Sequence, residues 1–186
     1  MNNKTRNIAL IAMMTALICV ASPVSIPIGP VPISLATLVI LLSVYILGMK
    51  RALTAVTLYL LIGLAGVPVF SGFSAGPAKL LGPTGGYLIG YIPMTFIAGY
   101  IIDRHYRNRI ISAGGMILAT AVLYLMGTVW LAYSAGMTFE AALAAGVIPF
   151  IPLDLVKIGI AAVLGPVIKT RLEKAGLVTE SRTVTS

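Results

Sequence analysis

Charged residues are scarce in this chain, and acidic residues are the scarcest of them. Only 10% of the 186 residues are charged, whereas 59% are hydrophobic, and 13 Lys and Arg stand against 5 Asp and Glu. A soluble domain of ordinary composition carries about 25% charged residues. With so few charges and a mean hydropathy of +1.02, the chain could not cover itself with a polar surface. The sequence therefore predicts an integral membrane protein with a single domain over residues 1–186.

Signatures of catalysis and of metal binding are also missing. Cys19 is the single cysteine and His105 the single histidine, so the chain has neither an intrachain disulfide nor a histidine cluster for a metal. It has no phosphate-binding loop, nucleophile elbow or zinc-protease motif. We therefore expect no enzyme activity, no catalytic residue, no metal and no cofactor, and the chain by itself should not hydrolyse ATP.

Long apolar runs make up most of what is present. A membrane-spanning helix needs about 20 mostly apolar residues. The first run begins with basic residues, as a signal peptide does, but further apolar runs follow directly and favour a membrane helix. The sequence predicts an all-α polytopic membrane protein with six transmembrane helices, over residues 7–22, 33–49, 52–69, 85–103, 110–134 and 147–169.

The basic residues are distributed unevenly between the two sides of this predicted bundle. All but two of the 13 lie before the first helix, between the second and third, between the fourth and fifth, or after the sixth. The positive-inside rule places these segments, and both termini, in the cytoplasm. Such short clusters between apolar runs indicate membrane topology rather than nucleic-acid binding. The two exceptions, Lys79 and Lys157, do not follow this rule, so they are candidates for a functional role.

Both long connections on the outer side have unusual compositions. Residues 22–34 contain four prolines, and residues 68–86 are rich in glycine. Neither segment suits a lipid-facing helix, because proline removes a backbone donor and glycine weakens helices. Irregular backbone at membrane depth is tolerated where it is buried in protein or lines a cavity. We expect these connections to fold back as lids, with ordinary surface loops as the alternative.

The final predicted helix carries an acid and a base in an otherwise apolar stretch. Asp154 and Lys157 are three residues apart, which places them on one face of a helix. A charge in the membrane costs at least about 2.5–3.5 kcal/mol and usually marks a substrate or ion path. The alternative is a purely structural ion pair. A ligand inserted between the two side chains would reconcile both interpretations.

Other candidate ligand-binding residues lie near the same outer end. Gly85 and Gly86 open the fourth helix, where a helix N-terminus favours an anion, although glycine also serves helix packing. Tyr87 offers a ring with a polar tip. Lys79 would pair with an anionic ligand or be solvated. Trp130 would stack on a ligand ring or belong to the interfacial aromatic belt.

Small residues form a stripe on the first helix. Ala9, Ala12 and Ala16 recur at intervals of three and four residues. Small residues at such spacing let two membrane helices approach closely. The stripe therefore predicts either packing inside the bundle or contact with a partner protein.

Three segments together resemble one known family. They are GPVPISLATL, LLGPTGGYLIG and PFIPLDLVKIGIAA, and the resemblance extends over nearly the whole chain. The chain resembles the BioY family, the biotin-specific substrate-binding (S) components of energy-coupling-factor transporters of the prokaryotic cell membrane. The resemblance implies six helices and an outward-facing biotin site capped by the first and third loops. It also implies partnership with a membrane scaffold subunit and two ABC-type ATPases.

The resemblance assigns roles to individual residues. Asp154 and Lys157 match the acid and base of the family's final helix, and Ala12 and Ala16 match its small-residue motif. Biotin has a ureido group, fused apolar rings and a valerate carboxylate. The ureido group would meet the acid and base, Tyr87 and Trp130 would pack on the rings, and Lys79 or backbone N–H groups would meet the carboxylate. A stand-alone facilitator, an ion-coupled carrier and a membrane enzyme are the alternatives.

Overall fold

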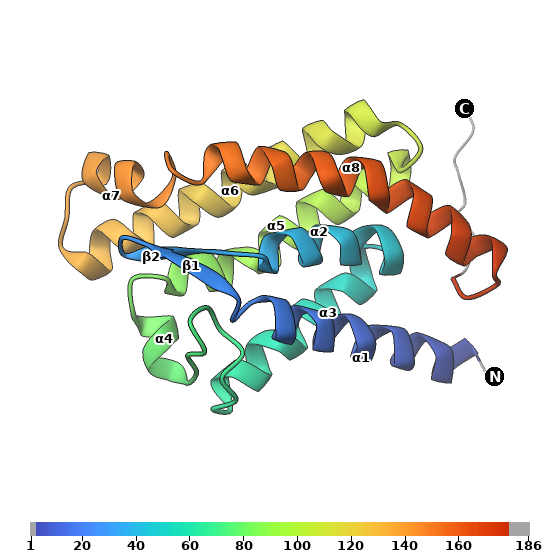
Figure 1. Ribbon diagram of the computed structural model, residues 1–186, viewed down its shortest axis with the longest axis horizontal. Coiled ribbons are helices and arrows are strands. Elements are labelled where there is room, and N and C mark those ends of the chain that lie inside the picture. Colours follow the sequence, from blue (N-terminus) through green and yellow to red (C-terminus); the bar gives the residue numbers. More distant parts are fainter. Residues whose placement is uncertain (1–2, 179–186) are drawn as a thin grey trace.

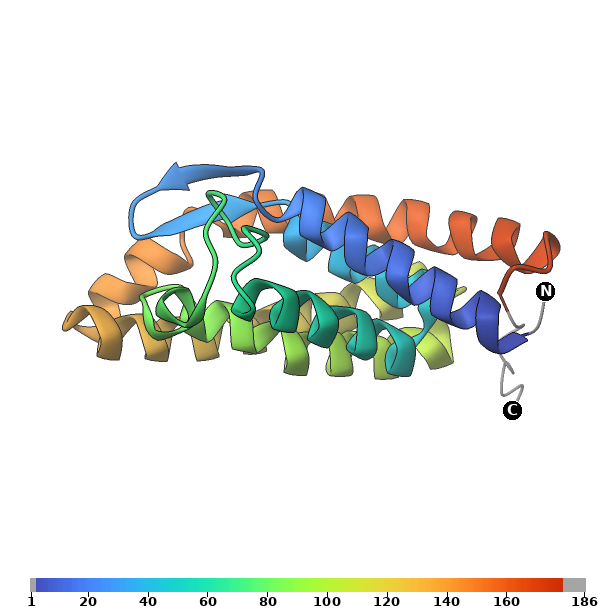
Figure 2. The ribbon, with the colours of Figure 1, turned by 90° about the horizontal axis from the view of Figure 1, so that it is seen from below.

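The computed structural model describes residues 3–178, which form a bundle of helices lying along one long axis (Figures 1 and 2). Eight helices and one two-stranded sheet are present in this part of the chain. In chain order the elements are α1 (Asn3–Ala21), β1 (Ser25–Ile28), β2 (Val31–Ser34), α2 (Ala36–Leu47), α3 (Met49–Leu64), α4 (Pro77–Leu81), α5 (Gly85–His105), α6 (Arg109–Ala135), α7 (Phe139–Gly146) and α8 (Ile151–Lys174).

The two ends of the bundle differ in what they carry. The β1–β2 hairpin, α4 and α7 gather at one end, which we call the lid end (Figures 1 and 2). The starts of α1 and α3, the α5–α6 connection and the end of α8 lie at the other (Figure 1). Those four places hold the clustered Lys and Arg residues. The fold thus collects the bases at the end opposite to the lid end.

The predicted helices match the observed ones in place but not always in length. Each of the six predicted ranges corresponds to one long helix, namely α1, α2, α3, α5, α6 or α8. Within residues 3–178, four helices are long and apolar enough to cross a membrane: α1, α5, α6 and α8. α2 has only 12 residues and α3 has 16.

The first outer connection is a β-hairpin, so the prediction of an all-α chain is wrong there. β1 and β2 pair antiparallel, with Ile28 opposite Val31 and Pro27 opposite Pro32. Gly29 takes the turn with φ +66°, a conformation that glycine adopts at little cost. Both strands of an isolated two-stranded sheet are edge strands, and proline is tolerated in edge strands. Residues 33 and 34, which the sequence predicts as the start of the second helix, belong to β2.

The second outer connection folds back over the first. The backbone N–H of Gly72 donates to Ser25 Oγ at 3.0 Å and to the Pro23 carbonyl at 3.2 Å. Phe70 and Ser74 form a short bridge before α4 begins. These contacts show that the two connections pack on each other, whereas their role as lids stays a prediction. Neither α4 nor α7 was expected, and residues 147–150, predicted as helix, form the turn that precedes α8.

Close packing between α5 and α6 rests on glycine. A Cβ on Gly86 would overlap with the Cβ of Trp130 and lie 2.8 Å from the Met126 carbonyl oxygen. A Cβ on Gly127 would likewise overlap with the Tyr87 ring. Because each glycine faces a large side chain on the other helix, the two backbones approach closely along their halves at the lid end. This contact sets the position of Tyr87.

A glycine that packs against the neighbouring helix should tolerate a side chain less well than a glycine that faces open space, and this difference is testable. Gly86→Ala should lower the melting temperature of the protein in detergent, because the new methyl group meets a neighbouring backbone and overpacking costs about 1–3 kcal/mol. Gly114→Ala is the matched control on α6, since no atom lies within 4 Å of its Cβ position. That variant should leave the melting temperature unchanged or raise it, because alanine has the higher helix propensity. Equal melting temperatures for the two variants would contradict the packing argument.

Candidate functional site

Asp154 and Lys157 lie in the first two turns of α8, at its lid end, and face the bundle interior. Their side chains form an ion pair, with Lys157 Nζ 2.7 Å from Asp154 Oδ1. Only 6% of Asp154 and 8% of Lys157 is exposed. The predicted i, i+3 pairing on one face is therefore confirmed.

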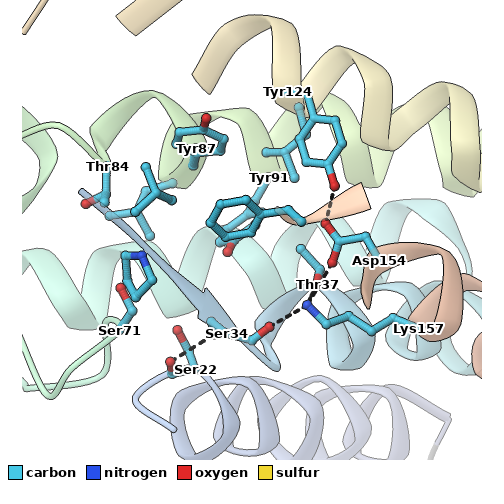
Figure 3. Close-up of a pocket in the computed structure, with 15 residues that line it drawn as sticks. Ser22, Ser34, Thr37, Ser71, Thr84, Tyr87, Tyr91, Tyr124, Asp154 and Lys157 are labelled. Carbon is cyan, nitrogen blue, oxygen red and sulfur yellow. Dashed lines mark hydrogen bonds and ion pairs between the residues drawn. The ribbon is translucent and has the colours of Figure 1, made fainter. Parts of the chain in front are cut away.

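The Lys157 ammonium has three N–H donors, and the structure provides an acceptor for each. Besides Asp154, it donates to the backbone carbonyl of Ser34 at 2.8 Å and to Thr37 Oγ1 at 3.2 Å (Figure 3). Ser34 ends β2 and Thr37 lies in the first turn of α2. Lys157 thus ties α8 to the base of the hairpin, more than 100 residues earlier in the chain.

Tyr124 completes the network from α6. Its hydroxyl donates to Asp154 Oδ2 at 2.6 Å, so each carboxylate oxygen has a donor (Figure 3). Reasoning from the sequence missed this tyrosine. It lies in a long apolar helix, and nothing in its local sequence distinguishes it from a tyrosine of the bundle core. Its partner is 30 residues away, so only the packing of α6 on α8 reveals the contact.

A cavity lies directly beside this network, beneath the hairpin. The cavity is partly open to solvent, and together with that open space it measures about 550 Å³. The hairpin, the second outer connection, α2, α5, α6 and α8 all contribute to its wall. The lining residues are Ser22, Val31, Pro32, Ser34, Thr37, Ser71, Thr84, Tyr87, Leu88, Tyr91, Leu123, Tyr124, Phe150, Asp154 and Lys157.

The cavity has a charged end, an aromatic wall and a hydroxyl-bearing end. Tyr87 and Tyr91, one turn apart on α5, lie between the Asp154 network and Thr84 (Figure 3). The Tyr87 hydroxyl donates to the Gly146 carbonyl at 2.9 Å, which fixes the ring. Thr84 Oγ1 is buried and has no hydrogen-bond partner within residues 3–178. A buried polar atom without a partner favours a polar ligand group at that end.

Four of the other predicted ligand residues are not brought to this cavity. Trp130 donates from its indole N–H to the Gly82 carbonyl at 2.9 Å and packs against Gly86. Gly85 is likewise closely packed, facing the Leu80 backbone. Lys79 lies on α4, where partial burial lowers the pKa of its amine. None of these four residues (Trp130, Gly86, Gly85, Lys79) lines the cavity, whereas Tyr87 does. The two glycines and the tryptophan position α5 instead.

The alanine stripe lies on the outside of α1. Ala9, Ala12 and Ala16 are all exposed, whereas Met14 and Ile18 are buried against the bundle. Of the two interpretations of the stripe, packing inside the bundle is therefore wrong.

Within residues 3–178, no three His, Cys, Asp or Glu side chains lie together in a group that could hold a metal ion.

Comparisons with known proteins agree on one family. Residues 1–174 match the profile of the BioY family. A probable biotin transporter BioY of Pyrococcus horikoshii is 39% identical over 161 residues, covering 87% of this chain and 94% of that protein. The biotin transporter BioY of Thermotoga maritima is 36% identical over 159 residues, covering 86% of this chain and 93% of that protein.

The fold is shared with a solved structure of the same kind. It is the S-component for biotin from an ECF-type ABC transporter. The two chains superpose with a TM-score of 0.80 at 31% identity, covering 94% of this chain and 95% of the other. With its several apolar helices, the protein is a multi-pass protein of the cell membrane. Profile, sequence relatives and fold together show that this chain belongs to the BioY family.

Proposed function

We propose that this chain captures biotin in the cavity beneath its hairpin, as the S component of an energy-coupling-factor importer. The observation that carries the proposal is the buried Asp154–Lys157–Tyr124 network on the cavity wall. It occurs in a chain whose relatives in two organisms are named as biotin transporters. Buried ionisable groups in membrane helices mark substrate paths.

The chemistry of biotin suits the polarity of the cavity. The ureido group has two N–H donors and one carbonyl acceptor. Asp154 accepts from a ureido N–H, and Lys157 or Tyr124 donates to the ureido oxygen. The fused apolar rings pack against Tyr87 and Tyr91, as flat apolar groups do on aromatic walls. The carboxylate accepts hydrogen bonds, and the ammonium and the phenol donate them. The site can therefore pair with both the N–H groups and the carbonyl oxygen of the ureido group.

The membrane topology that we propose has six crossings, with both termini in the cytoplasm. α2 rises only about 18 Å over its 12 residues, so it crosses the bilayer only together with the hairpin that precedes it. Irregular backbone at that depth is allowed where it lines a cavity, and Val31, Pro32 and Ser34 of the hairpin line this one. The clustered bases then face the cytoplasm and the lid end faces outward.

Transport in this proposal requires partners that hydrolyse ATP. The exposed stripe Ala9, Ala12 and Ala16 is the contact face for the membrane scaffold subunit, which in turn binds two ABC-type ATPases. The stripe suits a partner helix because small side chains permit close van der Waals packing in lipid. The chain itself captures biotin and carries out no reaction.

Removing charge from the pair should weaken biotin binding. Asp154→Asn should raise the Kd of the purified chain about tenfold or more, because a charge-assisted hydrogen bond worth about 1.5 kcal/mol or more is lost. Lys157→Ala should weaken binding as well, and it also leaves Asp154 buried with one donor fewer. Titration calorimetry with biotin measures both effects.

Ser43→Ala is the control for the loss of a buried polar group. Ser43 is buried on α2, donates to the Ile40 carbonyl of its own helix and does not line the cavity. Its variant should bind biotin like the parent. If the Asp154 and Lys157 variants fold and also bind like the parent, the pair is structural and the proposed site is wrong.

The topology can be tested by cysteine labelling in a Cys19→Ala background. Lys79→Cys should react with a membrane-impermeant maleimide added to whole cells, because α4 lies at the lid end. Lys174→Cys, at the end of α8, should react only after the cells are permeabilised. The opposite labelling pattern would show that the bundle is inverted in the membrane.

Capture and assembly should be separable functions. Ala12→Trp or Ala16→Trp should leave biotin binding by the isolated chain within about twofold, because the stripe faces away from the cavity. The same change should abolish co-purification with the scaffold subunit and ATP-driven uptake, since a bulky side chain prevents close helix contact. Leu17→Trp, exposed on another side of α1, is the control and should preserve both. Uptake that persists without the ATPases would instead indicate a stand-alone carrier.

A further inference from the structure

A second hollow lies at the end of the bundle opposite to the lid end. It runs between the last turns of α5 and the first turns of α6 and is widely open on the surface of the bundle. α5 contributes Tyr100, Ile101 and Arg104, and α6 contributes Ile111, Gly114 and Leu118. We call it the α5–α6 groove. It shares no lining residue with the biotin cavity.

The groove exists because α6 has glycine where a side chain would fill the space. A Cβ on Gly114 would meet no atom within 4 Å, so the position is open. Its neighbour Gly115 packs against Ile101 and holds the two helices together at the groove floor. Ile111 and Leu118 are 42% and 54% exposed along its side. The groove is therefore a largely apolar hollow on the surface of the bundle.

The inner end of the groove is positively charged. The Arg104 guanidinium lies 3.6 Å from the centroid of the Tyr100 ring, which holds it over the groove wall. His105 also lines this end and is exposed. Asp103, the acid next to them in sequence, is turned toward α3, where it accepts from the Met49 N–H at 2.9 Å. The acid therefore does not neutralise the Arg104 guanidinium.

We propose that the α5–α6 groove binds an anionic phospholipid. One acyl chain lies along Ile111, Gly114 and Leu118, and the phosphate meets Arg104 and His105. Basic pockets between membrane helices on the cytoplasmic side bind anionic head groups, and tyrosine and arginine near a helix end belong at the membrane interface. The apolar floor distinguishes this site from one for a free phosphate. This inference does not depend on biotin as the transported substrate.

Native mass spectrometry of the purified chain in mixed micelles tests the proposal. The chain should retain phosphatidylglycerol several-fold more than phosphatidylcholine. Arg104→Gln should lower phosphatidylglycerol retention about fivefold, because one cationic contact with the head group is lost. Gly114→Leu should lower retention of both lipids, because its side chain fills the groove.

Two control variants separate this site from general effects of charge and bulk. Gly159→Leu adds the same side chain at another exposed glycine with no atom within 4 Å, on α8. Arg171→Gln removes an exposed base at the same end of the bundle. Both should retain phosphatidylglycerol like the parent.

Several outcomes would overturn the proposal. Unchanged retention in Arg104→Gln and Gly114→Leu, or an equal loss in the controls, would show that no defined lipid site exists. Displacement of the lipid by millimolar glycerol phosphate would indicate a phosphate site without a role for the acyl chain. If Gly114→Leu retains lipid but no longer co-purifies with the scaffold subunit, the groove is a protein-docking surface instead.

Discussion

The buried ion pair between Asp154 and Lys157 is the constraint on which the lid-end half of this protein depends. A carboxylate and an ammonium inside an apolar bundle need neighbours that replace water, and removing one partner of such a pair is strongly destabilising. Here Tyr124 from α6, Thr37 from α2 and the backbone of Ser34 provide these neighbours. Satisfying two charges therefore brings α2, α6, α8 and the hairpin together at one point, and the cavity forms beside it.

The same network connects the site to the lid. Ser34, held through its carbonyl by Lys157, donates from its hydroxyl to the Ser22 carbonyl at 2.9 Å. Ser22 Oγ in turn lies 2.6 Å from the Tyr59 hydroxyl on α3. If a ligand group replaces the Ser34 carbonyl or Thr37 Oγ1 as acceptor for the Lys157 ammonium, the base of the hairpin is held differently. Direct hydrogen bonds thus connect the ion pair to the base of the hairpin and to α3.

Much of this arrangement could be predicted from the sequence, because apolar run length and charge placement report directly on a membrane fold. The pair stood out because two charges in an apolar helix have few explanations. The hairpin could not be foreseen: the four prolines of residues 22–34 argued against a helix but did not specify a strand register. Trp130 and Gly86 lie in the α5–α6 contact and not on the cavity wall, a difference that the sequence does not reveal because such residues serve both ligand contact and helix packing. Tyr124 and Thr37 were missed because they meet the pair only through tertiary contacts.

The central claim is that the buried pair both holds the outer half together and recognises biotin. The most direct test is an experimental structure of the chain with biotin bound. The account predicts the ureido ring in the cavity beneath the hairpin, with one N–H within about 3 Å of the Asp154 carboxylate and the bicyclic rings against Tyr87 and Tyr91. Biotin bound elsewhere, with every hydrogen bond of Asp154 and Lys157 unchanged, would contradict it.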